Sequence, residues 1–177
     1  MRKIALTVTA CALWAAPAAL TASALADVPA QPGQAVAAAE AGASSARIGD
    51  DYPYRNGDPR KPDRWNFYQR ECTSFVAWRL NQLGVRFHNH YKGVRWSNAK
   101  NWDDAARRVG IRVDHRPTVG SVAQRNGGRF GHVAYVAKVS GNRVLLEEYN
   151  HRGTHRYKNP PRWINAGEMD NYLHIAR

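Results

Sequence analysis

The stretch WNFYQRECTSFVAWRLNQL, from Trp65 to Leu83, decides the fold because it places a cysteine at the start of a helical pattern. Gly84 follows the pattern as a stop signal. Apolar residues recur at helical spacing on the same stripe as Cys72, namely Phe75, Val76, Leu80 and Leu83. We therefore predict an amphipathic helix whose first turn holds Cys72.

Two interpretations of Cys72 follow from this position. Backbone N–H groups without partners and the positive end of the helix dipole favour a thiolate at a helix start, which would suit a nucleophile. Alternatively, Cys72 is a small buried core residue, which is common for cysteine. The helix alone leaves both interpretations open.

The first 26 residues predict a secretory signal. Arg2 and Lys3 form a charged start, an apolar run follows from residue 4 to 24, and Ala24-Leu25-Ala26 is a small-residue cleavage site. A membrane anchor is the alternative, but Pro17 interrupts the run and no basic flank follows it. We predict cleavage before Asp27, a secreted protein, and no membrane association afterwards.

Signal cleavage changes the number of cysteines. The chain has two cysteines, and Cys11 lies within the predicted signal. Cys72 would then remain without an internal partner in an oxidising compartment. A solitary thiol there is buried and inert, pairs with another chain, or acts as a nucleophile.

The charge predicts anionic partners. The chain of 177 residues has 26 Lys and Arg against 14 Asp and Glu, a formal net charge of +12. Such a charge attracts polyanions, including an anionic cell envelope. Because the basic residues are spread along the chain, we expect no sequence-specific nucleic-acid binding.

Composition divides the rest of the chain into two parts. Residues 27–49 are rich in Ala, Gly, Ser and Pro, which predicts a flexible spacer. Residues 50–177 are long enough for one domain with one core, and we expect a monomer.

Two groups of residues raise the question of a metal ion. Asp50, Asp51, Asp58 and Asp63 lack the alternating oxygen-ligand spacing of a calcium loop. His88 and His90 have no Cys or carboxylate at ligand spacing nearby, so a surface loop is the better interpretation. We predict no metal and no other cofactor.

Further elements follow from periodicity and turn residues. Ser97 or Asn98 can cap a second helix that ends at Gly110. Extended segments are predicted at 111–113 and 119–123, and a turn at 125–129. Residues 131–150 predict an antiparallel hairpin around Ser140-Gly141-Asn142.

The hairpin register brings polar residues together. With a three-residue loop, Val139 pairs with Arg143, and His132 lies opposite Asn150 while Ala134 lies opposite Glu148. His132, Glu148 and Asn150 then project from one face of the sheet. With Cys72, these side chains supply a nucleophile, a base and an orienting group, as a cysteine hydrolase needs.

Five blocks of this sequence, taken in order, resemble the CHAP family of cysteine- and histidine-dependent amidohydrolases and peptidases. The resemblance spans about residues 51 to 176. The blocks are RECTSFVAWR (70–79), WSNAKNW (96–102), PTVGSVA (117–123), GHVAYV (131–136) and EEYN (147–150).

The resemblance implies an α+β, papain-like fold, with N-terminal helices packed on an antiparallel sheet, and cleavage of amide bonds in the peptide part of peptidoglycan. It implies that Cys72 is the nucleophile, His132 the base, Glu148 its orienting group and Asn150 a polar neighbour. Many members have Gly-Gln before the cysteine, where this chain has Arg70-Glu71. A glutamate cannot donate a side-chain hydrogen bond to an oxyanion, so the backbone N–H of Cys72 would carry more of that role.

Substrate contacts are less constrained by the sequence. Trp65, Trp96 and Tyr149 are candidate cleft walls, with peptidoglycan and anionic wall polymers as expected partners. The scissile bond stays open between an N-acetylmuramoyl-L-alanine amidase and an endopeptidase. A related NlpC/P60 hydrolase, a non-catalytic basic envelope-binding protein and a secreted antibacterial toxin are the alternatives.

Overall fold

The computed structural model describes residues 47–177. The predicted signal peptide, residues 1–26, and most of the predicted spacer, residues 27–49, lie outside the described residues. Gly49 already contacts the core, since its N–H donates to Glu147 Oε1 at 2.9 Å. The domain start at residue 50 stays a prediction.

The fold is α+β, as predicted, with one six-stranded antiparallel sheet in the order β1-β6-β2-β3-β4-β5. The helices are α1 (Cys72–Gln82), α2 (Trp102–Arg108) and four short 3-10 turns, η1 (Tyr91–Gly93), η2 (Ala99–Asn101), η3 (His151–Gly153) and η4 (Ala166–Glu168). The strands are β1 (Val113–Asp114), β2 (Val122–Arg125), β3 (His132–Ser140), β4 (Arg143–Glu147), β5 (Arg162–Asn165) and β6 (Asn171–Leu173).

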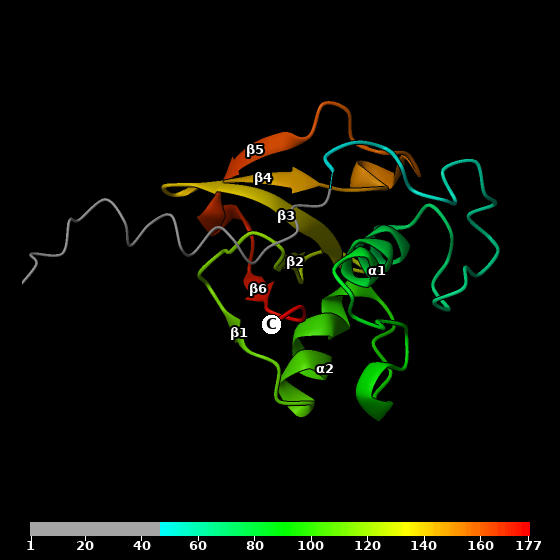
Figure 1. Ribbon diagram of the computed structural model, residues 1–177, viewed down its shortest axis with the longest axis horizontal. Coiled ribbons are helices and arrows are strands. Elements are labelled where there is room, and N and C mark those ends of the chain that lie inside the picture. The colour runs from blue at the N-terminus through cyan, green and yellow to red at the C-terminus, as the bar shows by residue number, and fades with distance from the viewer. Residues whose placement is uncertain (1–46) are drawn as a thin grey trace, which may run out of the picture.

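Both α-helices lie on the same side of the sheet, with α1 beside β3 (Figure 1). The main core fills this interface, and a smaller apolar cluster covers the opposite face of the sheet. In residues 47–177, every helix is too short or too polar to cross a membrane.

Helix α1 begins at Cys72, where the sequence predicted its first turn, and ends in a left-handed Gly84 with φ of 83°. The predicted single apolar face is wrong, however, because nine consecutive residues from Cys72 to Leu80 are buried. The preceding segment covers the outer side of the helix, where the Tyr52 ring packs edge-on against Phe75. Cys72 therefore starts a helix that is enclosed on all sides.

The second predicted helix is present but shorter. Residues 99–101 form the 3-10 turn η2, and α2 starts only at Trp102. Its predicted stripe packs into the core, with Trp102, Ala105 and Ala106 buried. Gly110, in the left-handed region, follows its end as expected.

The predicted hairpin forms, but its loop is one residue shorter than expected. Ser140 pairs with Arg143, so the expected pairing of Val139 with Arg143 is wrong. A bulge between Val136 and Lys138 then shifts the register by one residue. Beyond it, Tyr135 pairs with Glu147, which is the register that a three-residue loop would have given.

The predicted position of Asn150 opposite His132 is wrong. Strand β4 ends at Glu147, and the chain turns away through Asn150, whose φ is 55°. The ladder that would have aligned Asn150 with His132 stops three residues earlier. Asn150 is thus free to reach a different partner.

Short strands shifted from their predicted positions. The segment expected at 119–123 is β2, which starts at Val122 and runs to Arg125. The turn predicted at 125–129 therefore starts one residue too early, since Arg125 pairs with His132. The segment predicted at 111–113 is the two-residue β1 at Val113–Asp114.

A buried ion pair joins α1 to the sheet. Arg79 Nη2 lies 2.6 Å from Glu147 Oε1, and both side chains are fully buried. The Arg79 guanidinium also lies over the Trp78 ring at 4.3 Å, and Tyr157 OH donates to Glu147 Oε1 at 2.7 Å. Removing Arg79 would leave the buried charge of Glu147 without an opposite charge beside it.

We predict that Arg79→Met lowers the free energy of unfolding by about 3–5 kcal/mol, the usual cost of breaking a buried ion pair by removing one partner. Urea unfolding followed by tryptophan fluorescence measures it. Arg86→Met, at an exposed position, is the control and should change the free energy by less than about 0.5 kcal/mol. Equal effects of the two substitutions would contradict a stabilising pair.

Candidate active site

Cys72 lies at the N-terminus of α1 and is 7% exposed. The backbone N–H groups of the first helical turn have no intrahelical acceptors, so they point toward the space in front of the thiol. These groups and the helix dipole together form a site that favours negative charge.

The loop that enters α1 is held by Asp63. Asp63 Oδ1 accepts hydrogen bonds from the backbone N–H groups of Trp65 at 2.8 Å and Phe67 at 2.9 Å. Asp63 Oδ2 accepts one from the hydroxyl of Ser74, which lies in the first turns of α1. Asp63 thereby ties the loop before Cys72 to the helix after it, and both of its oxygens are engaged.

His132 begins β3 beside Cys72. Gly131 precedes it with φ of 72°, and a Cβ there would lie 2.5 Å from the backbone nitrogen of Lys100 and 2.7 Å from the backbone oxygen of Arg125. Only glycine fits this close approach, which fixes where β3 starts. His132 Nε2 lies 2.7 Å from Glu148 Oε2, and the side chain of Cys72 is the other group that acts on the ring.

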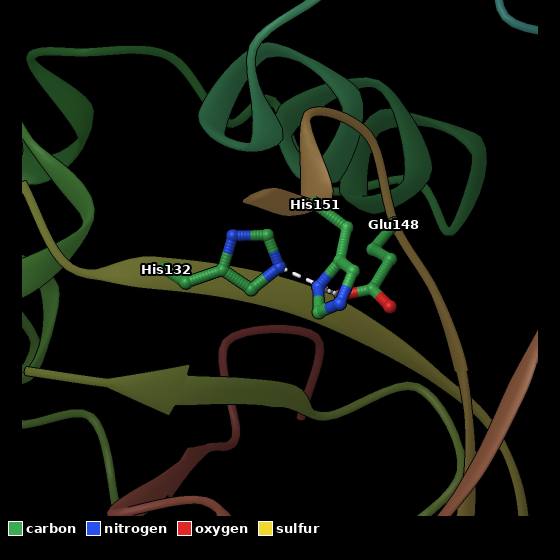
Figure 2. A group of neighbouring side chains, drawn as sticks. All are labelled: His132, Glu148 and His151. Atoms are coloured by element: carbon green, nitrogen blue, oxygen red, sulfur yellow. Dashed lines mark hydrogen bonds and ion pairs between the residues drawn. The ribbon is translucent and has the colours of Figure 1, made fainter. Parts of the chain in front are cut away.

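Glu148 is fully buried, and its carboxylate contacts three basic side chains. Arg162 Nε, from β5, donates to Oε1 at 2.5 Å, while His132 and His151 lie on Oε2 at 2.7 and 3.5 Å. Figure 2 shows the two imidazoles converging on the carboxylate, with His132 from β3 and the other two residues from the chain after β4. Cys72, His132 and Glu148 thus form a continuous chain of contacts.

The charges of this group reinforce one another. Burial alone would lower the pKa of His132, but the charge of Cys72, its hydrogen bond and Glu148 raise the pKa to about 10. Burial alone would raise the pKa of Glu148, but the hydrogen bonds from His132 and Arg162 lower the pKa to about 2. At neutral pH the pair is therefore imidazolium and carboxylate.

Asn150 contacts the residue before the cysteine and not the histidine. Its Nδ2 donates to Glu71 Oε2 at 2.6 Å, and its Oδ1 accepts the backbone N–H of His155 at 2.8 Å. The imidazole of His155 lies 3.0 Å from the other oxygen of Glu71. The Glu71 carboxylate is consequently held at the edge of the site by two side chains.

The structure places the three predicted cleft aromatics in the core. Trp65 and Trp96 are buried, with Trp96 packed edge-on against Trp102 at 5.6 Å between ring centroids. Tyr149 is buried against Phe75, and its hydroxyl donates to Asp50. Their side chains therefore pack the core that supports the site.

Cys72 and His132 open into a cleft of about 1250 Å³. Two exposed aromatic side chains line it, Tyr68 at 60% and Phe130 at 54% exposure. Sequence analysis did not select them, although each precedes a site residue by a few positions. The signals that could have found them are an aromatic residue four positions before Cys72 and another aromatic residue two positions before His132.

His151 and Arg162 were also missed. His151 follows Glu148 by three residues, but it does so after the strand has ended, where periodicity predicts no direction. Arg162 reaches Glu148 because β5 pairs with β4, placing Arg162 opposite Leu146. The sequence carried no turn or alternation clear enough to predict that pairing.

His132, Glu148 and His151 have the residue types and the proximity of a metal site, since their ligand atoms lie within 4.8 Å of one another. A ligating imidazole must be neutral, whereas the pKa of about 10 keeps His132 protonated at neutral pH. Arg162 brings a further positive charge to the same carboxylate. The chemistry of the group fits a hydrogen-bonded acid–base cluster better than a cation.

The family model for the CHAP domain matches residues 62–150, which hold Cys72, His132 and Glu148. The chain belongs to the CHAP family. The resemblance predicted from the five sequence blocks is therefore confirmed, and so is the fold class, two helices on a six-stranded antiparallel sheet.

CHAP relatives include two staphylococcal proteins, both named N-acetylmuramoyl-L-alanine amidase sle1. The Staphylococcus haemolyticus protein is 54% identical over 83 residues, covering 45% of this chain and 23% of its own length. The Staphylococcus aureus (strain USA300) protein is 37% identical over 111 residues, covering 59% and 30%. The chain thus spans less than a third of either relative's length.

A crystal structure of an N-acetylmuramoyl-L-alanine amidase from Staphylococcus aureus shares this CHAP fold. It superimposes with a TM-score of 0.53 at 24% sequence identity, over 66% of this chain and 33% of that one. The likeness supports the fold.

The low pKa of Glu148 predicts acid sensitivity. A carboxylate whose pKa falls from 4.5 to about 2 on folding stabilises the native state fully above pH 4.5, and this contribution is lost as the pH falls toward 2. The stabilisation lost is about 3 kcal/mol. Urea unfolding between pH 6 and 2 should show a steeper loss of stability in the parent than in Glu148→Gln, and equal slopes would contradict the assignment.

Proposed function

We propose that the protein is a secreted cysteine hydrolase that cleaves amide bonds in the peptide part of peptidoglycan. The observation that carries the proposal is the contact chain from Cys72 through His132 to Glu148 at a helix start that opens into a large cleft. Membership of the CHAP family and relatives named as amidases support it.

In the proposed first step, the Cys72 thiolate attacks the amide carbonyl. The new C–S bond places a negative charge on the carbonyl oxygen, and the first-turn N–H groups of α1 stabilise that charge. His132, protonated at rest, gives its proton to the departing amine. The C–N bond breaks, which leaves a thioester on Cys72.

In the second step, water hydrolyses the thioester. The now neutral His132 takes a proton from the water as it attacks and keeps it, while the C–S bond breaks and Cys72 leaves as a thiolate, which regenerates the ion pair. Glu148 stays ionised throughout and holds the ring in the orientation that faces the thiol. Arg162 and burial keep the Glu148 carboxylate fixed.

We assign Asn150 a role on the nucleophile side. It holds the carboxylate of Glu71, the residue whose backbone leads into Cys72 and the first N–H groups of α1. Its contribution would then be to fix the position of the thiol and of the oxyanion donors. The carboxylate of Glu71 itself supplies no hydrogen to an oxyanion.

For the scissile bond, we propose the amide between muramic acid and L-alanine as the first to test. The names of the two staphylococcal relatives favour an amidase. An endopeptidase would use the same chemistry on a bond within the peptide. Both enzymes would need the protein outside the cell, in contact with the wall.

We predict that the protein releases fragments from purified peptidoglycan and that Cys72→Ala reduces the rate by roughly 10³-fold or more, because the nucleophile is lost. Turbidity follows the lysis, and mass spectrometry of the new termini identifies the bond. Circular dichroism checks that the variant is folded.

Two outcomes would count against this proposal. If Cys72→Ala retains full lytic activity, the thioester mechanism is wrong. If neither protein cuts walls of any chemotype while both bind them, a non-catalytic envelope-binding protein is the better account.

We predict that the pH dependence of kcat/KM reports the pKa of His132. The imidazolium is lost as the pH rises through about 10, so kcat/KM should fall there. Glu148→Gln removes the carboxylate that raises the pKa of His132, so its alkaline limb should move to lower pH by about one unit or more. Initial rates between pH 6 and 11 measure the shift.

Asn150→Ala is the matched comparison, since Asn150 touches Glu71 and not His132. We expect it to lower the rate while its alkaline limb stays where the parent has it. A shift with Asn150→Ala and none with Glu148→Gln would transfer the orienting role to Asn150.

A further inference from the structure

Six arginines line the cleft that holds Cys72 and His132, against two glutamates. The arginines are Arg60, Arg95, Arg125, Arg129, Arg152 and Arg162, and the glutamates are Glu71 and Glu168. So many like charges in one cleft repel one another and raise the local positive potential. The cleft therefore favours a negatively charged ligand.

The few acidic groups of the cleft are already occupied. Glu71 is bound by Asn150 and His155, and Glu168 Oε1 accepts the backbone N–H of Asn165 at 2.9 Å. Each glutamate is thus engaged by donors of the protein itself. Hydrogen bonds do not remove the charge of a carboxylate, so two negative charges stand against six positive ones and the cleft stays net positive.

Most of the arginines, by contrast, have no carboxylate partner. Arg60 pairs with Asp58, and Arg162 pairs with Glu148. The other four arginines are Arg95, Arg125, Arg129 and Arg152. Within residues 47–177, none of these four lies within ion-pair distance of a carboxylate. Their guanidinium groups remain available to a ligand.

Two of these four lie next to the acid–base group. Arg125 is the strand partner of His132, and paired residues project from the same face of a sheet. Arg152 follows His151, which contacts Glu148. Both arginines line the cleft that holds Cys72, so a substrate that places its scissile bond at Cys72 lies in the same cleft as Arg125 and Arg152.

We propose that Arg125 and Arg152 select stem peptides whose carboxyl groups are free rather than amidated. Guanidinium groups bind carboxylates through paired, charge-assisted hydrogen bonds, which a neutral carboxamide cannot match. The proposal rests on the proposed function and adds the substrate class. Phosphate of wall polymers would also suit arginine, but a peptide is what must lie beside the reacting cysteine.

The test uses two synthetic muropeptides of the same sequence, one with free carboxyl groups and one with the same groups as carboxamides. We expect the protein to cleave the free form with kcat/KM about tenfold higher or more, because each charge-assisted hydrogen bond contributes enough for a factor of this size. The difference should lie mainly in KM, since the contact is made in the ground state as well. It should shrink at high salt.

The decisive variant is Arg125→Gln with Arg152→Gln. We expect it to bring kcat/KM on the free muropeptide down to within about threefold of the carboxamide form, because both charge-assisted contacts are lost. Arg86→Gln with Arg108→Gln is the matched control, since both positions are exposed and neither lines the cleft. This control removes the same net charge and should keep the preference.

The outcomes separate the two proposals. Equal cleavage of the two muropeptides by the parent would overturn the carboxylate preference while leaving the hydrolase proposal intact. An equal loss of preference in both double variants would also overturn it, since overall charge would then be the cause. If neither muropeptide is cut and whole peptidoglycan is also left intact, the hydrolase proposal fails and takes the preference with it.

Discussion

The buried ion pair between Arg79 and Glu147 is the contact on which the position of the site depends. It joins α1, which starts with Cys72, to the last residue of β4, which is followed by Glu148. A buried charge pair tolerates little displacement, because each partner loses its buried opposite charge if the other moves. The nucleophile and the orienting carboxylate are therefore fixed relative to each other from inside the core. His132 reaches both from β3, which lies between α1 and β4 in contact with each.

The acid–base group shows how a buried charge is stabilised by its neighbours. Glu148 is removed from water, yet its pKa falls because Arg162 and His132 bind its two oxygens. The same carboxylate, together with Cys72, raises the pKa of His132. The imidazolium of His132 and the carboxylate of Glu148 thus stabilise each other.

The positive net charge of the chain is located at a particular place in the fold. Along the sequence the basic residues are spread out, which indicated only a general attraction to polyanions. In the fold, four arginines without carboxylate partners among the described residues gather at the cleft from three separate segments. The charge that sequence analysis could describe only as an average is concentrated where the substrate would lie.

By itself, the sequence determined the α+β class, the CHAP family, the start of α1 at Cys72, and the hairpin that brings His132 to Glu148. The class and the family followed from the resemblance of five sequence blocks, whereas the helix start and the hairpin followed from helical spacing, turn residues and strand pairing between neighbours in the chain, which are local properties. Contacts between distant segments were decided only by the tertiary structure. The bulge between Val136 and Lys138 compensated for a shorter loop, so Tyr135 pairs with Glu147 as a three-residue loop would have placed it, although the ladder ends there. Asn150 bound Glu71 because β4 ended before it, and Trp65, Trp96 and Tyr149 went into the core because the segments packed around them enclose them there. Periodicity can place a side chain on a face of its own element, but only packing decides which other element covers that face.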